Sequence, residues 1–131
     1  MKLLLDTHVL LWWLADDARL GSRARALIAD PANDVLVSAV SLWEIAVKTR
    51  VGKLVASLDD VLDAVRENGF LRLGLEDAHL RVLMGLALHH RDPFDHLLVA
   101  QALAEGAVFC SGDADVGRYG GEVVGGDYAS M

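Results

Sequence analysis

Four acidic residues stand where the chain passes from an apolar strand-like run into a turn, or near the start of a helix-like segment. They are Asp6, Glu44, Asp95 and Asp113. Carboxylates that meet in one place bind hard divalent cations, and such cations activate water for an in-line displacement at phosphorus. We therefore expect these four residues to form a catalytic site that binds Mg²⁺, with Mn²⁺ as a substitute, and hydrolyses phosphodiesters.

Asp6 ends the run Leu3-Leu4-Leu5, which lacks the in-and-out alternation of a half-exposed strand and is typical of a central parallel strand. Ligands of open α/β sheets bind beyond the carboxyl ends of the strands, where Asp6 would lie. Taken alone, Asp6 is equally consistent with an N-cap of the following helix, because Asp is a preferred cap residue. Thr7 is a second candidate for the cap and for support of the site.

Glu44 lies in a segment that predicts a helix, and the plain alternative is a surface ion pair with Lys48, four residues on. At 100° per residue, however, Glu44 shares its helix face with Val40, Val47 and Val51. A carboxylate on a packed face is costly unless a cation meets it. We therefore favour a functional role for Glu44.

Asp95 is the third residue of a helix that Asp92 and Pro93 are expected to begin, Asp92 as the N-cap and Pro93 as the first helical residue. A reciprocal cap with Asp92 is the alternative for Asp95. The apolar residues of the helix fall on the same side as Asp95; they are Leu98, Val99 and Ala102. Asp95 is therefore expected to point towards the sheet.

Asp113 follows Ser111-Gly112 at the end of an apolar strand, and an ordinary turn would also explain it. Asp115, two residues on, could take its place in the site. Ser111 could orient a carboxylate or a water bound to the metal. The strand before Asp113 would deliver it to the same edge as Asp6.

The elements that position these acids alternate along the chain. We expect strands at about 3–5, 34–38, 70–73 and 107–110, a weak strand at 122–124, and helices at about 7–17, 22–29, 40–50, 57–68, 76–86 and 92–105. Ser22 and Ser57 are expected as helix N-caps. This order predicts an α/β protein with three α/β/α layers and a central, mainly parallel sheet of four to five strands.

The 131 residues are expected to form one domain, since the chain shows no linker, repeat or low-complexity segment. A single cysteine, Cys110, excludes a disulfide framework and fits a reducing cytoplasm. We expect no signal peptide and no membrane span, because the longest apolar run, residues 9–15, is too short. A net charge of −7 argues against binding nucleic acid by charge attraction alone, but allows binding through metal ions.

Basic residues are few, and two groups of them flank the acids. Lys48, Arg50 and Arg91 are the candidates for contacts with substrate phosphates. Lys53 is as well explained by an exposed surface. Three of the five histidines, His8, His89 and His90, are not expected to act as catalytic bases or metal ligands.

The segment 9–15 is apolar nearly all round, which indicates a helix that is buried or covered by a partner. Trp12 and Trp13 would point about 100° apart, so we expect one in the core and the other against another subunit or protein. Trp43 is expected in the core.

Three segments, residues 3–8, 38–48 and 90–102, resemble the PIN-domain ribonucleases, and more narrowly the VapC toxins of type II toxin–antitoxin pairs. The resemblance runs from residue 1 to about 120. It implies a Mg²⁺-dependent endoribonuclease that forms a homodimer and is inhibited by a cognate VapB-type antitoxin. Carried over by motif, Asp6 and Asp95 would be the main metal ligands, completed by Glu44 and Asp113.

One departure from these relatives concerns the residues after Asp113. Relatives commonly have a basic residue next and an aromatic residue two positions on, whereas Ala114, Asp115 and Val116 follow here. The alternatives to an RNA toxin are a structure-specific DNA nuclease of related fold and a non-catalytic α/β signalling module. A phospho-acceptor module would need a lysine after a late strand, and the segment 111–113 has none.

Overall fold

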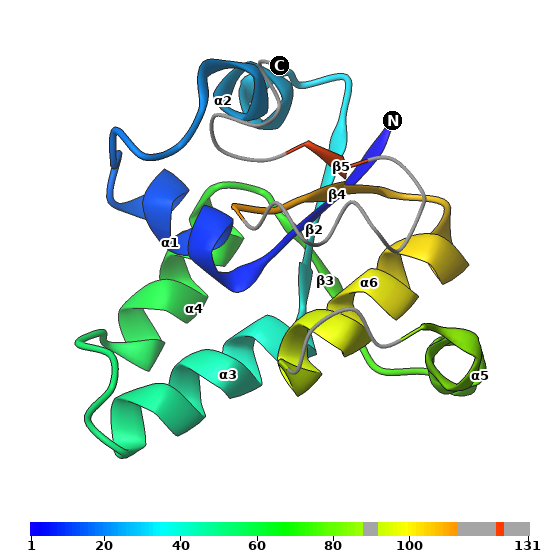
Figure 1. Cartoon of the computed structure of the whole chain (residues 1–131). Helices are drawn as coiled ribbons and strands as arrows, with labels where there is room; N and C mark the ends of the chain where they lie inside the picture. The colour runs from blue at the N-terminus through cyan, green and yellow to red at the C-terminus, as the bar shows by residue number, and fades with distance from the viewer. Residues whose placement is uncertain (88–91, 113–122, 125–131) are drawn as a thin grey trace.

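A computed structural model describes residues 1–87, 92–112 and 123–124 of the chain. Within them, five strands form one sheet in the order β3-β2-β1-β4-β5, and all neighbouring strands run parallel (Figure 1). The strands are β1 (Lys2–Leu5), β2 (Asp34–Ser38), β3 (Leu71–Leu73), β4 (Val108–Cys110) and β5 (Val123–Val124). The predicted parallel sheet is confirmed.

Helices cover both faces of the sheet, as the sequence predicted. They are α1 (Thr7–Leu14), α2 (Ser22–Ala29), α3 (Ala39–Arg50), α4 (Leu58–Glu67), α5 (Asp77–Gly85) and α6 (Pro93–Glu105). Figure 1 shows α1 and α4 on one side of the strands and α5 and α6 on the other. In the described part of the chain, every helix is too short or too polar to cross a bilayer.

The central strand β1 explains why its sequence is apolar at successive positions. Leu3 and Leu5 pack in one core cluster with residues of α1, α2 and α4, whereas Leu4 packs in a second cluster with residues of α6. All three leucines are fully buried. Because successive side chains of a strand point to opposite faces, a strand covered on both faces has no polar position. The three layers are therefore confirmed.

Helix caps largely follow the predicted chemistry. The Asp92 side chain accepts from the backbone N–H of Phe94 and of Asp95, and Pro93 opens the helix. Ser57 caps α4 by accepting from Asp60 N at 3.3 Å. The prediction for Ser22 is wrong: Gly21 is the N-cap of α2, with extended backbone, and Ser22 is the first helical residue.

The predictions for the tryptophans were wrong in part. Trp43 is 58% exposed instead of lying in the core. Trp12 and Trp13 are both half-buried, so neither is wholly inside. Trp13 donates to Asn68 Oδ1 at 3.1 Å and packs against Phe70. The helical periodicity identified apolar faces but could not decide how completely neighbouring helices cover them.

The strand order changes direction at β1: β2 lies on one side of this strand and β4 on the other. Such a reversal leaves a crevice beyond the carboxyl ends of the two strands. Here the switch point lies at the carboxyl ends of β1 and β4, where the backbone N–H of Asp6 donates to Cys110 O at 2.8 Å. Asp6 and the residues after Cys110 are thus neighbours.

Candidate active site at the carboxyl edge of the sheet

Asp6 is 3% exposed and uses both carboxylate oxygens. Oδ1 accepts from the backbone N–H of Val9 at 2.8 Å, so Asp6 is the N-cap of α1. Oδ2 accepts from the backbone N–H of Gly112 at 3.2 Å, and the Ser111 hydroxyl donates a further hydrogen bond. The cap and the site position are therefore both present in one residue, and neither excludes the other.

Burial raises the pKa of Asp6 because the charged form loses its hydration, and hydrogen bonds from Val9, Ser111 and Gly112 offset this only in part. A carboxylate in this state gains from a cation that meets it. Burial also raises the pKa of the adjacent Cys110 thiol to about 12, with the Asp6 charge as the second cause. Cys110 is thus protonated at neutral pH and is no thiolate ligand or nucleophile.

Glu44 is 2% exposed, although it lies on α3. Its Oε1 accepts from the Thr7 hydroxyl at 2.5 Å, and its Oε2 pairs with the Lys48 ammonium group. The ion pair offered as the plain alternative is therefore present, but the carboxylate is buried. The predicted apolar face ends early, because only Val40 is buried, while Val47 and Val51 are exposed.

Lys48 connects α3 with the start of α6. Its pKa is raised, first by the hydrogen bond to Glu44 and further by the charges of Glu44, Asp92 and Asp95, against a lowering by burial. Its ammonium nitrogen lies 5.9 Å from the centre of the Phe94 ring. The charge of Asp95, half-buried in the first turn of α6, therefore acts on the same cation as that of Glu44.

Other predicted residues are placed as follows. Thr7 and Ser111, expected as supporting residues, are buried and contact Glu44 and Asp6 respectively. Arg50 is exposed at the end of α3. Asp113, Asp115 and Arg91 lie outside the described residues, as do His89 and His90.

A different trio is the one group of metal-ligating side chains within 4.8 Å of one another in the described part of the chain: Glu76, His79 and Glu105. The fully buried His79 accepts at Nδ1 from the backbone N–H of Glu76, so its Nε2 carries the proton and donates to Glu105 Oε2 at 2.9 Å. Gln101 also donates to Nδ1, at 3.3 Å. Both ring nitrogens are used, which makes this trio a hydrogen-bond network.

The donor set at the carboxyl edge of the sheet fits a hard divalent cation. Asp6 and Glu44 offer buried carboxylate oxygens, which Mg²⁺ and Mn²⁺ prefer over nitrogen or sulfur. Lys48 already places one positive charge against Glu44. This cation compensates Glu44, whereas Asp6 is stabilised mainly by hydrogen bonds and only slightly by the nearby His8, so Asp6 has the most to gain from a metal ion.

Sequence reasoning missed Gly112, whose role depends on a close approach. A Cβ atom at this position would lie 2.6 Å from Cη2 of Trp12, a distance that requires something to shift. Glycine lets the indole pack against the chain and lets the Gly112 N–H reach Asp6. The only signal in the sequence is a glycine directly after a strand, which is common in loops.

Ser38 is the N-cap of α3, and sequence reasoning also missed its hydrogen-bond partner. The Ser38 hydroxyl accepts from Val40 N and donates to Gln101 Oε1 on α6. Both side chains are fully buried. This contact ties the helix that carries Glu44 to the helix that carries Asp95.

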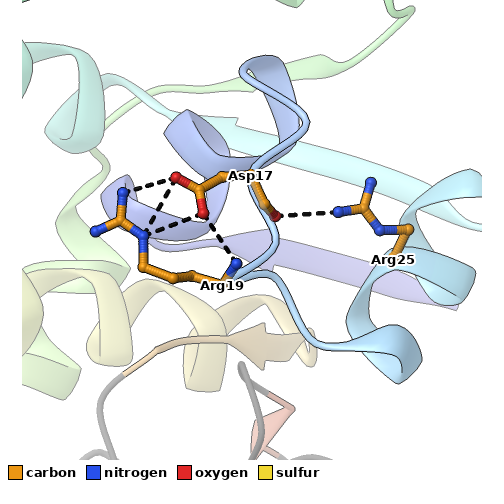
Figure 2. A network of polar contacts seen from close by, with 3 residues as sticks. All are labelled: Asp17, Arg19 and Arg25. Carbon is orange, nitrogen blue, oxygen red and sulfur yellow. Dashed lines mark hydrogen bonds and ion pairs between the residues drawn. The ribbon is translucent and has the colours of Figure 1, made fainter.

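The turn between α1 and α2 contacts Trp12 through the side chain of Arg19. Figure 2 shows the Asp17 carboxylate accepting from the side chain and backbone of Arg19, while Arg25 donates to the backbone carbonyl of Asp17. The hydrogen bonds from Arg19 hold the pKa of Asp17 at about 2. The Arg19 guanidinium lies 5.5 Å from the centre of the Trp12 ring, so the turn and the indole stack together.

Fold and site together define an α/β protein with buried carboxylates at the switch point of a parallel sheet. The sequence model of the PIN domain matches residues 3–122, and the chain belongs to this family. Ribonuclease VapC16 of Mycobacterium tuberculosis is 39% identical over 61 residues, which are 44% of this chain and 43% of that protein. The match thus spans less than half the length of this relative.

Solved structures share the fold at low identity. The structure of VapBC2 from Rickettsia felis bound to a promoter DNA fragment contains a chain with a TM-score of 0.72 and 14% identity, over 95% of this chain and 98% of that chain. VapBC-5 from Mycobacterium tuberculosis gives a TM-score of 0.63 and 21% identity, over 95% and 96%. At these identities the likeness concerns the fold, and it agrees with the three-layer architecture.

Proposed function

We propose that the protein is a Mg²⁺-dependent endoribonuclease and the toxin of a VapBC-type toxin–antitoxin pair. The observation that carries the proposal is the buried Asp6 carboxylate at the switch point, close to the Thr7–Glu44–Lys48 contacts. Membership of the PIN family and the relative named ribonuclease VapC16 support it. The acidic site is completed by Asp95 and, in this proposal, by Asp113.

In this proposal, each residue of the site has a separate role. Asp6 and Asp95 would hold the metal, which when bound lowers the pKa of water and balances charge at phosphorus. Thr7 keeps the Glu44 carboxylate in place through its hydroxyl. Lys48, which pairs with Glu44, would also contact a substrate phosphate.

The first experiment compares cleavage of an unpaired RNA by the wild-type protein and by Asp6→Ala, with Mg²⁺ or with EDTA. We expect cleavage only by the wild-type protein with metal. Asp59→Ala, which removes an exposed acid from the first turn of α4, is the matched control and should cleave normally. Full activity in EDTA or in Asp6→Ala would refute the metal mechanism, and preference for a DNA oligonucleotide of the same sequence would refute the RNA assignment.

Metal binding can be measured without activity. Mg²⁺ or Mn²⁺ at about 100 times its dissociation constant should add about 2.7 kcal/mol to the free energy of unfolding. Differential scanning fluorimetry should therefore show a higher Tm with metal for the wild-type protein and for Asp59→Ala. Asp6→Ala should show no such shift; an equal shift would place the metal elsewhere.

The toxin role includes a cognate VapB-type antitoxin, a homodimer and action in the cytoplasm. Structural neighbours described as VapBC complexes support such a partner. Induced expression should arrest growth of a bacterial host, and co-expression of the antitoxin should relieve the arrest. Light scattering on the purified protein should give twice the chain mass of 14.1 kDa. Harmless expression of an active nuclease would count against the toxin role.

A further inference from the structure

Among the aromatic residues in the described part of the chain, Trp43 is the one that the fold leaves open to solvent, with 58% of its surface exposed. It directly precedes Glu44, whose carboxylate is buried on the same helix. Trp12 and Trp13, in contrast, are half-buried. An exposed indole gains free energy when a ligand covers its apolar surface, so its neighbours decide which ligand fits.

Phe94 fixes the position of this indole. The centres of the two rings are 4.9 Å apart and their planes meet at 65°, which is an edge-to-face contact. Phe94 directly precedes Asp95, as Trp43 precedes Glu44. Two aromatic residues from α3 and α6 therefore meet beside two of the proposed metal ligands.

Lys48 supplies the charge next to this aromatic pair. Its ammonium group pairs with Glu44 and lies over the Phe94 ring. A nucleic acid offers the matching groups in the same order, a flat base and then a negative phosphate. We propose that Trp43, supported by Phe94, is a stacking site for one unpaired base of an RNA substrate, next to the phosphate that is cleaved.

The proposal rests on the proposed ribonuclease function and adds that the substrate must be single-stranded at this base. Bases within a duplex are already stacked and cannot reach the indole. A protein partner is the competing occupant, because Val51, the C-cap residue of α3 about two helical turns beyond Trp43, is also apolar and exposed. A protein interface of ordinary size covers about 800 Å² per partner and would include Val51, whereas a base would cover only Trp43.

The test uses Asp6→Ala as background, so that RNA binding is measured without cleavage. Fluorescence anisotropy with Mg²⁺ present gives the Kd of a labelled unpaired RNA and of the same RNA in a duplex. Adding Trp43→Ala should weaken binding of the unpaired RNA roughly 5- to 100-fold, the range of one lost base–aromatic stack, and leave the duplex unaffected. Trp43→Phe should retain most of the affinity, and Val51→Ser should bind like the background protein.

Kinetics of the cleaving protein give a second readout. Trp43→Ala should raise KM for unpaired RNA by a similar factor and leave kcat nearly unchanged, since the indole binds the base before and during cleavage. An unchanged Kd in Trp43→Ala would overturn the proposal. So would an equal loss from Val51→Ser, or a halved mass in light scattering of Trp43→Ala, because each would assign the surface to a protein or a second copy. A wild-type protein that cleaves no RNA would refute the ribonuclease function itself, and this result is distinct from a failure of the stacking proposal.

Discussion

Asp6 is an N-cap and also a candidate site carboxylate, two interpretations that the sequence offers as alternatives. One carboxylate oxygen caps α1 and the other binds the backbone after β4, so the residue is held rigidly at the switch point. The same burial that orients it raises its pKa and leaves a charge that a cation can compensate. A buried acid of this kind costs folding energy until its counter-charge arrives, which is common for residues kept for function.

Gly112→Ala should disturb this arrangement through Trp12. The added Cβ would lie 2.6 Å from Trp12 Cη2, so either the indole or the chain must move, at about 1–3 kcal/mol of unfolding free energy. Urea denaturation measures this loss, and a metal titration should show weaker binding because the Gly112 N–H moves from Asp6. Gly85→Ala is the control: nothing lies within 4 Å of its Cβ, and it should be neutral or slightly stabilising. Equal stability of the two variants would contradict the prediction.

Asp17 should titrate at a pH well below that of an ordinary carboxyl group. Its pKa falls from 3.8 to about 2 because Arg19 binds the charged form. The contact with Arg19 is thus fully present above pH 3.8 and is lost as the pH falls towards 2. NMR of the side-chain carboxyl measures the midpoint, which should return towards 3.8 in Arg19→Gln. A wild-type midpoint near 3.8 would show that the contact is absent in solution.

At the scale of elements, the two helices that carry Glu44 and Asp95 are linked by a buried hydrogen bond as well as by side-by-side packing. Ser38 at the start of α3 contacts Gln101 in the middle of α6, and Gln101 in turn donates to the carbonyl of Gly74 and to His79. This buried network continues to α5. It sets the distance between α3 and α6, on which any shared cation site depends.

Ser38→Ala should therefore cost more than an ordinary cap. It removes the cap of α3 and leaves Gln101 Oε1 buried without its donor, for a combined loss of about 2–4 kcal/mol. Ser57→Ala is the matched control, since Ser57 is an exposed cap of α4, and it should cost about 1 kcal/mol or less. Urea denaturation of both variants measures the difference. Equal costs would mean that the Ser38–Gln101 contact adds nothing.

At the scale of the whole molecule, an acidic chain is proposed to bind an acidic polymer. The net charge is −7, with 12 Lys and Arg against 19 Asp and Glu. General charge attraction cannot drive such binding, so it must depend on base stacking and a few placed cations, to which bound metal ions add in the wild-type protein.

The salt dependence of RNA binding should accordingly be shallow. Suppose that Lys48, Arg50 and Arg91 each neutralise one phosphate. A plot of the logarithm of the association constant against the logarithm of the salt concentration should then have a slope of about −2 for a single strand. Anisotropy over a range of KCl concentrations measures the slope in Asp6→Ala. Arg50→Ala should reduce it by about 0.7, whereas Arg66→Ala, which removes a cation paired with Asp63 on α4, should not. A much steeper slope would reveal a basic surface beyond these residues.

Local patterns in the sequence were enough to predict the fold, which the structure confirms, and to select four acids whose role in a metal site stays a prediction. The run Leu3-Leu4-Leu5, the caps Ser57 and Asp92, and the alternation of strands and helices each depend on neighbours close in the chain. The strand-end position of Asp6 follows from the same local reading. The identity of Asp113 as a site residue stays a prediction, since it lies outside the described residues.

Only the tertiary structure decided which contacts form between distant segments. Gly112 approaches Trp12 across about a hundred residues of chain, Ser38 finds Gln101, and Trp43 stays open because Phe94 covers just one part of it. Helical spacing tells which residues share a face, but how far that face is covered depends on the placement of the next helix. The sequence by itself therefore determined the sheet and pointed to the candidate acids, while packing decided how Asp6 and Glu44 are held and which aromatic surface remains beside them.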